Sequence, residues 1–388
     1  MSRKRKVWLV LSLALALFLT WRFTRRLNIF VVDDKFATTL PVEIPAGLTG
    51  IRATDCGVCH QEIYQEWKTS IHAQAWLDPY YQVDRAFEGD PPVCDHCHLQ
   101  LEPQRDYLIT GFHDRGRLYP IKTPNPGFDP ELQAEGVTCA VCHLREGKII
   151  GPFETDSVVH PVKVDRSFLS GMSPCYICHV VSGERWDTFY RFPPCGTVAE
   201  IAARGNPPDC VSCHMPAVTR PVVKGGVPRR GGRHSFQGGH SPVKVESALA
   251  VRYQQKDTGG KITFTFELTN VGAYHHLPTG TPDRHLTLEL RLLDRLDREI
   301  DRRTFKMIRR VLWRPFIMDL WDTRLPYEEP REYTWSFPRD RRPRPAVLEA
   351  TVRYHLLAES RRRRIGYQNE TPIAYPIYRN RIDLKTKS

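Results

Sequence analysis

One pattern, Cys-x-x-Cys-His, occurs five times in this chain and constrains it more than any other feature. The chain has 388 residues, 11 cysteines and 15 histidines, a composition from which about 0.01 such matches are expected by chance. Ten of the eleven cysteines fall in these motifs, and an odd cysteine total excludes a closed disulfide framework. The chain must therefore fold around whatever the five motifs bind.

The motif is that of covalent haem attachment, in which two thiols form thioethers with the haem and the adjacent imidazole becomes the proximal iron ligand. Zinc sites and redox dithiols also use Cys-x-x-Cys pairs, but neither explains a histidine directly after all five pairs. We therefore predict five covalently bound c-type haems. The attaching cysteines are Cys56, Cys59, Cys94, Cys97, Cys139, Cys142, Cys175, Cys178, Cys210 and Cys213. The proximal ligands are His60, His98, His143, His179 and His214.

The sixth iron ligand decides what each haem can do, and ten histidines remain to supply it. A second imidazole makes a low-spin haem suited to electron transfer, whereas an open position binds a small molecule such as nitrite or hydroxylamine. Loop histidines are the best distal candidates, and a weaker candidate opens a Leu-Pro-Thr-Gly turn. The five loop candidates are His72, His113, His160, His234 and His240, and the weaker one is His275.

The positions of three histidines and of the remaining cysteine suggest separate roles. His72 lies twelve residues after His60, about 18 Å along a helix, so we expect it to cap a neighbouring haem. His285 and His355 lie in alternating strand patterns and are expected to be structural. Cys195 is the leftover cysteine, interpreted as an unused thiol, with a reactive thiol or an iron ligand as the alternatives.

The N-terminus predicts where the chain resides. The segment Ser2–Lys6, which holds four basic residues, precedes an apolar run, Val7–Trp21, which is followed by further arginines. Fifteen helical residues span about 22 Å, short of a full bilayer core, so a cleaved signal peptide competes with an uncleaved anchor. We favour a signal-anchor, because flanking basic side chains extend the span and no small-residue cleavage site follows the run. Because covalent haem attachment in bacteria occurs outside the inner membrane, the body should face the periplasm.

The net charge of +12, from 56 basic and 44 acidic residues, would ordinarily suggest a nucleic-acid partner. Each ferric haem brings a formal charge of about −1, which lowers the total to roughly +7. We therefore expect no nucleic acid partner.

Composition divides the chain into a signal-anchor helix at 1–27, a linker at 28–50, a pentahaem cytochrome domain at 51–241 and a β domain at 242–388. The haem domain should be mainly irregular with some helix, and its clearest helical periodicity covers Gln61–Trp76. Five apolar macrocycles should supply its core, so we expect it to be unfolded without haem. The basic run Arg361–Arg364 is read as a solvated face or as a docking site for anionic lipid or an acidic partner.

Period-two alternation marks the C-terminal part and predicts an antiparallel β-sandwich. A hairpin turn is expected at 257–260. The alternating segments are 243–246, 262–268, 286–292, 333–337 and 348–355.

The segment Cys56–Ala73 reads Cys-x-x-Cys-His-x-x-x-Tyr-x-x-Trp-x-x-Ser-x-His-Ala and resembles the opening of multihaem cytochromes related to the tetrahaem electron acceptor of hydroxylamine oxidoreductase. Segments 136–143 and 210–216 also fit, and 270–280 is similar to a segment in relatives that carry an appended β-sandwich. The resemblance implies that His72 is a distal haem ligand. Five motifs exceed the tetrahaem pattern, Tyr274 stands where relatives often have glycine, and no Cys-x-x-Cys-Lys motif of pentahaem nitrite reductases is present.

These observations predict a membrane-anchored, extracytoplasmic pentahaem cytochrome that relays electrons in a respiratory chain through mostly bis-histidine haems. Its partners would be redox proteins, either a quinol-oxidising membrane complex or other cytochromes. The alternative is an oxidoreductase that acts on a small nitrogen or sulfur compound at one open haem. A structural subunit that docks a larger redox complex through the β domain is a third interpretation.

Overall fold

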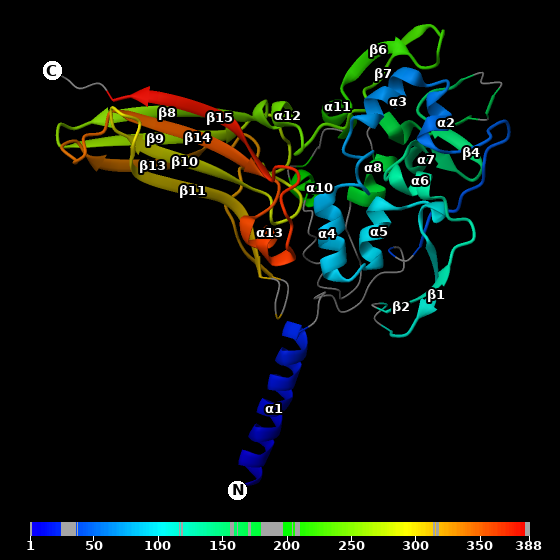
Figure 1. Ribbon diagram of the computed structural model, residues 1–388, viewed down its shortest axis with the longest axis horizontal. Coiled ribbons are helices and arrows are strands. Elements are labelled where there is room, and N and C mark those ends of the chain that lie inside the picture. The colour runs from blue at the N-terminus through cyan, green and yellow to red at the C-terminus, as the bar shows by residue number, and fades with distance from the viewer. Residues whose placement is uncertain are drawn as a thin grey trace.

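The computed structural model consists of a long N-terminal helix and two lobes that lie side by side (Figure 1). The helical lobe holds the short helices up to residue 246, and the sheet lobe holds the large sheets of residues 249–384. The structure describes residues 2–24, 36, 38–115, 117, 119–155, 159–160, 162–169, 172–179, 197–203, 205, 210–312, 315 and 318–384.

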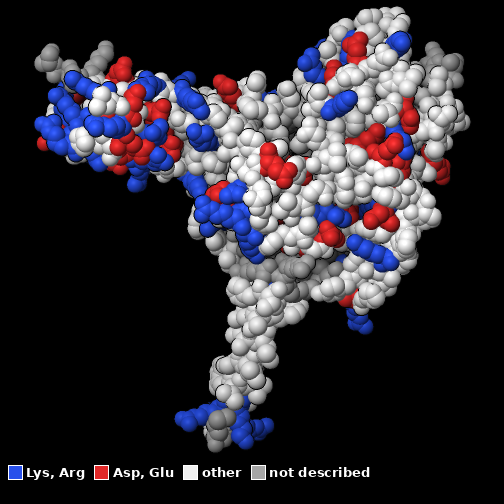
Figure 2. Space-filling view, viewed as in Figure 1, with Lys and Arg blue, Asp and Glu red and all other residues white. Residues whose placement is uncertain are grey.

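Helix α1 (Arg3–Thr24) extends away from both lobes and contains the predicted apolar run. In the part of the chain that is described, it is the one helix long and apolar enough to cross a membrane, a test that signal sequences also pass. Figure 2 shows Lys and Arg gathered at its free end and an uncharged surface along its length. Its other end contacts the sheet lobe, where the buried Arg22 Nε donates a 2.9 Å hydrogen bond to the carbonyl oxygen of Pro315.

Five short helices hold the Cys-x-x-Cys-His motifs, four of them whole, whereas the first motif begins in its helix and continues through a turn to His60. Residues at i, i+3 and i+4 share one face of a helical turn, so the two thiols and the imidazole of a motif project from the same side. Short helices with intervening turns agree with the prediction of a domain poor in long regular elements. The five are α2 (Ala53–Gly57), α5 (Pro92–His98), α7 (Cys139–His143), α8 (Met172–His179) and α11 (Cys210–His214).

The helix predicted over Gln61–Trp76 is wrong in its length, because α3 (Gln61–Lys68) ends eight residues earlier. Its amphipathic face is real, since Trp67 is buried and its Nε1 donates a 2.9 Å hydrogen bond to the carbonyl oxygen of Val137. Beyond Lys68 the chain continues as a series of turns. The Ser70 hydroxyl there accepts a 3.3 Å bond from the amide of Ala73, a local alternative to helical bonding.

Helix α4 (Pro79–Glu88) has strong local signals at both ends. The Asp78 carboxylate caps it by accepting a 2.8 Å hydrogen bond from the Tyr80 amide, and Pro79 occupies the first helical position. Gly89 ends it in a left-handed conformation with φ of 85°. These caps set where α4 begins and ends, and Tyr81 lies in its first turn.

Small elements complete the helical lobe, and they are mostly hairpins and single helical turns. The helices are α6 (Pro130–Ala134), α10 (Thr197–Ala202), α12 (Pro242–Glu246), η2 (Glu102–Gln104) and η3 (Arg166–Leu169). The strands are β1 (Tyr107–Phe112), β2 (Pro120–Pro124), β3 (Leu144–Arg145), β4 (Lys148–Gly151), β5 (Val162–Val164), β6 (Ala217–Pro221) and β7 (Pro228–Gly232).

The sheet lobe contains two antiparallel sheets. The larger has the strand order β12-β11-β10-β14-β15 and the smaller has the order β13-β9-β8. Their bounds are β8 (Leu249–Asp257), β9 (Lys261–Asn270), β10 (His285–Leu293), β11 (Glu299–Leu312), β12 (Met318–Asp322), β13 (Arg331–Pro338), β14 (Val347–His355) and β15 (Ala374–Asp383). The predicted antiparallel β structure is therefore confirmed.

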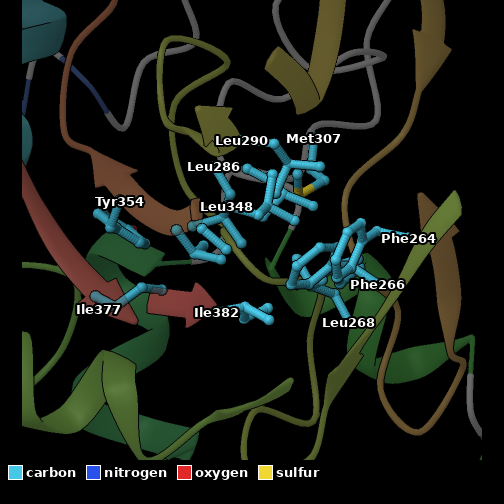
Figure 3. Packing of buried hydrophobic residues seen from close by; sticks show 14 of the residues in the cluster. Phe264, Phe266, Leu268, Leu286, Leu290, Met307, Leu348, Tyr354, Ile377 and Ile382 are labelled. Atoms are coloured by element: carbon cyan, nitrogen blue, oxygen red, sulfur yellow. The ribbon is translucent and has the colours of Figure 1, made fainter. Parts of the chain in front are cut away.

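One hydrophobic cluster joins the inner faces of both sheets (Figure 3). Alternation along β9 places Phe264, Phe266 and Leu268 in it, while Thr265 and Glu267 between them face outward. The facing sheet contributes Leu288 and Leu348, both fully buried. This core consists of side chains alone, so it needs no cofactor for its packing.

The strand predicted over 243–246 is wrong, because these residues form α12. Four alternating residues are too few to distinguish strand from helix. The local caps favour the helix, since Pro242 occupies its first turn and the Ser241 hydroxyl accepts a 3.4 Å bond from the Lys244 amide.

The two lobes contact each other through α4 and α13 (Glu359–Ile365). Arg361 donates to Asp84 at 2.5 Å and to Glu88 at 2.6 Å, and Tyr80 packs edge-on against Tyr367. The first arginine of the basic run is thus an interlobe residue and does not belong to a solvated face.

Candidate haem sites

Four of the five motif histidines are oriented by a backbone carbonyl that accepts a hydrogen bond from Nδ1–H. A donor at Nδ1 leaves the lone pair on Nε2, which is the tautomer that a metal requires. The fifth, His179, lies at the end of α8 with its pKa lowered by burial. The Nδ1–oxygen distances are 2.7 Å for His60 to Val222, 2.5 Å for His98 to Ala75, 2.8 Å for His143 to Ile150 and 2.7 Å for His214 to Gln237.

Four motif histidines also face a second histidine from elsewhere in the chain. A metal-bound imidazole nitrogen lies about 2.0 Å from the metal and about 1.1 Å from its ring centre, so two axial imidazoles have ring centres about 6.2 Å apart. All four observed separations match that value. They are 6.4 Å for His60 and His160, 6.3 Å for His179 and His72, 6.2 Å for His143 and His234, and 6.4 Å for His214 and His275.

The second histidines come from irregular segments. His72 lies in the turns after α3, and His234 directly follows β7. His275 lies in the sheet lobe, between β9 and β10. Burial, with the charge of neighbouring imidazoles, lowers the pKa of His72 to about 3 and that of His234 to about 4. Both are therefore neutral at physiological pH, the state in which imidazole binds iron.

His98 is the exception. Its ring stacks on Tyr81 of α4 with ring centres 3.6 Å apart and planes within 2°. All fifteen histidines lie among the described residues, and no second histidine ring pairs with that of His98 among them. The Tyr81 hydroxyl is buried and has no hydrogen-bond partner within the described part of the chain, and burial raises its pKa.

Two predicted distal ligands lie away from the motif histidines. His113 is exposed at the end of the β1–β2 hairpin, where its amide donates a 2.9 Å bond to the Tyr119 carbonyl. His240 is also exposed, and its Nε2 lies 3.4 Å from Arg284 Nη2. Neither ring contacts a motif histidine in the part of the chain that is described. Cys195 lies outside the described residues.

His285 and His355 form a cross-strand pair between β10 and β14. Their rings stack with centres 4.2 Å apart, and Nε2 of His355 lies 2.9 Å from the Thr287 hydroxyl. This pairing agrees with the structural role expected for both.

The sites are contiguous in space. Helix α2 of the first motif contacts α7 of the third, and α5 of the second contacts α8 of the fourth. The sulfur of Cys175 in the fourth motif lies close enough to Cys210 in the fifth to raise the pKa of Cys175. Phe236 packs against both His72 and His234, which joins the third and fourth sites.

A buried polar network supports the second motif and was missed by the sequence reasoning. Asp95 lies between the two cysteines of this motif, and its side chain is 0% exposed. It accepts hydrogen bonds from the Tyr107 hydroxyl at 2.5 Å and from Arg85 Nε at 3.1 Å. A carboxylate placed directly between the two cysteines of the motif was the one available signal.

These residues fit covalently attached haem. In each of the four paired sites, two imidazoles are spaced for one iron, and the two motif cysteines lie within four residues of the proximal histidine. Among the described residues no group of three or more His, Cys, Asp or Glu side chains is arranged to hold a metal ion. Two imidazoles need a porphyrin to complete the coordination of iron.

No protein-family model and no curated protein matches the sequence. Among solved structures, a match described as a beta-galactosidase from Bacteroides fragilis has 15% identity and covers 38% of this chain and 16% of that chain. Its TM-score of 0.18 is too low to bear on the fold. The crystal structure of a penta-heme cytochrome c552 from Thermochromatium tepidum matches with a TM-score of 0.65 at 20% identity, covering 88% of this chain and 100% of that chain. The chain therefore has the fold of a multihaem c-type cytochrome.

Proposed function

We propose that this protein is a pentahaem c-type cytochrome that relays electrons, anchored by α1 on the extracytoplasmic side of a membrane. The observation that carries the proposal is the set of four imidazole pairs with ring centres 6.2 to 6.4 Å apart. Haem iron supplies reversible one-electron chemistry when bound. The sheet lobe, with its two sheets around one core, is proposed to be a β-sandwich.

The residues of the chain favour electron transfer at these four sites. Carbonyl groups hold the proximal imidazoles of His60, His143 and His214 in one tautomer, and burial keeps the distal rings of His72 and His234 neutral. With both axial positions filled by fixed side chains, ligand exchange is suppressed. Axial ligands, burial and hydrogen bonding then set the reduction potential.

The contacts between sites favour a path with a branch at the fourth motif. The first site adjoins the third, and Phe236 links the third to the fourth. The second and fifth sites both adjoin the fourth. A redox partner, either a quinol-oxidising membrane complex or another cytochrome, would exchange electrons at one of the ends.

A second function rests on the His98 site. Its proximal histidine is oriented like the others, but the face of its ring stacks on Tyr81, and no second histidine pairs with it at the spacing of the other four sites among the described residues. A haem attached there with an open position could bind a small nitrogen or sulfur compound. The buried, unpartnered Tyr81 hydroxyl could then serve as a hydrogen-bond donor close to that haem.

Electron paramagnetic resonance (EPR) of the oxidised full-length protein tests both functions. The relay predicts at least four low-spin haems, and the second function predicts one high-spin signal that shifts with nitrite or hydroxylamine. Replacing His160 or His234 with alanine should open one further haem to carbon monoxide in the reduced protein. His113→Ala and His240→Ala are the matched controls and should change nothing. Unchanged carbon monoxide binding in the first two variants would refute the assigned pairs.

A further inference from the structure

The fifth site is assembled from both lobes. His214 belongs to α11 of the helical lobe, whereas His275 opposite it belongs to the sheet lobe. The planes of the two rings lie within 13° of each other. The spacing of this pair therefore depends on how the two lobes are held together near residue 275.

A buried ion pair crosses the junction at this point. Glu200 of α10 lies with its Oε1 2.8 Å from Arg324 Nη1 of the sheet lobe. The side chains are 7% and 5% exposed. Arg324 also pairs with Asp322 at 2.6 Å and donates a 3.2 Å bond to the Pro278 carbonyl. Because a buried charge that loses its partner is strongly destabilising, this pair resists separation of the lobes.

The second oxygen of Glu200 binds the segment that carries His275. Glu200 Oε2 accepts hydrogen bonds from the His276 amide at 3.0 Å and from the Thr279 hydroxyl at 2.9 Å. The hydroxyls of Thr197 and Thr279 lie 2.8 Å apart, which adds a second bond between α10 and this segment. The Glu200 carboxylate thus binds both His276, the residue next to His275, and Arg324.

Among the described residues, the other hydrogen bonds of this segment lie within its own lobe. The fully buried Asn270 donates to the carbonyls of Ala273 and His275 at 2.8 and 2.9 Å. Leu277 and Leu325 exchange two backbone hydrogen bonds of 2.8 and 3.0 Å. These bonds make the His275 segment rigid within the sheet lobe, but they do not set its distance from His214.

We infer that Glu200 is a positioning residue, which uses its bonds to Arg324, His276 and Thr279 to hold His275 as the sixth ligand of the fifth haem. This inference rests on the proposed haem ligation. The fifth haem would then report on lobe docking, because loss of the clamp releases its distal ligand while the other four sites, built within the helical lobe, remain as they are.

The test measures carbon monoxide binding by the dithionite-reduced full-length protein and EPR of its oxidised form. His275→Ala should add one carbon-monoxide-binding haem per chain over the wild type. Glu200→Ala should add the same haem, at least in part. Glu200→Gln, which keeps the two hydrogen bonds but loses the charge, should add less. Glu299→Gln, which removes a β10–β11 ion pair with Arg291 elsewhere in the sheet lobe, is the control and should add none.

The outcomes distinguish the proposed ligation by His275 from the proposed positioning role of Glu200. If His275→Ala adds no carbon monoxide binding, the proposed ligation is wrong. If His275→Ala opens the haem and Glu200→Ala, at full haem content, leaves it six-coordinate, the positioning role is wrong. Glu200→Asp guards against a folding defect, since partial restoration of the low-spin signal relative to Glu200→Ala would require a positioned carboxylate.

Discussion

The stacked pair His285–His355 should make the sheet lobe sensitive to acid. Burial, His285 and the nearby cations Lys306 and Arg353 all lower the pKa of His355, to about 3. Burial also lowers the pKa of His285, against a hydrogen bond to the Asp283 carbonyl. In the unfolded chain both imidazoles titrate near their ordinary value of about 6.5.

The direction of the effect follows from proton uptake. Between pH 6.5 and 3 the unfolded state binds protons that folded His355 does not, so stability is present above pH 6.5 and falls as pH decreases. At pH 5 the difference of about 1.5 units costs about 2 kcal/mol for His355 alone. That energy corresponds to a factor of about 30 in the opening equilibrium.

Hydrogen exchange followed by mass spectrometry measures this locally in the intact haem protein. After correction for intrinsic exchange, protection of peptides from β10 and β14 should fall about 30-fold between pH 8 and pH 5. His355→Gln keeps a hydrogen-bonding partner for Thr287 but does not titrate, so its protection should depend much less on pH. Equal pH dependence in the wild type and His355→Gln would refute the reasoning.

Three further predictions concern the lobes and the second motif. Arg361→Met, which removes the interlobe pairs with Asp84 and Glu88, should destabilise the contact between α4 and α13 by about 2 kcal/mol, seen as faster hydrogen exchange in both helices. Asp95→Asn removes a buried negative charge that accepts from Tyr107, so the haem of that motif should rise in potential in a redox titration. Haem-free protein should lose exchange protection throughout the helical lobe and retain it in β9, β10 and β14, whose core is made of side chains.

Each of these has a matched comparison. Arg363→Met is the control for Arg361, because Arg363 is 75% exposed and its loss should cost less than about 0.5 kcal/mol. Asp90→Asn is the control for Asp95→Asn, because Asp90 pairs with the same Arg85 but is 52% exposed. The Asp90 substitution should leave the reduction potential of the second-motif haem nearly unchanged. Native-like protection of the helical lobe without haem would show that its core does not depend on the cofactor.

Local patterns predicted much of this molecule. The spacing of Cys and His within each motif is a property of one helical turn, so the ten cysteines and five proximal histidines could be predicted directly. Alternation over seven or more residues located β9, β10 and β14 correctly. It failed at 243–246, where four residues are too few, and helical periodicity extended α3 too far.

The distal histidines were beyond any local pattern. His72 and His179 face each other although more than a hundred residues separate them, and His214 meets His275 across two lobes. Five loop histidines were equally plausible by composition, but three are placed opposite a motif histidine while His113 and His240 are not.

The sequence by itself therefore determined the cofactor class and the antiparallel character of the C-terminal half, and it predicted the attachment residues, because each depends on neighbours within a turn or a strand. Only the tertiary structure decided which imidazoles face each other, that His98 stacks on Tyr81, and that Glu200 bridges the lobes beside His275. Axial ligands must approach an iron from opposite sides of a plane, and no spacing along the chain encodes that requirement. It is met only when separate segments pack together.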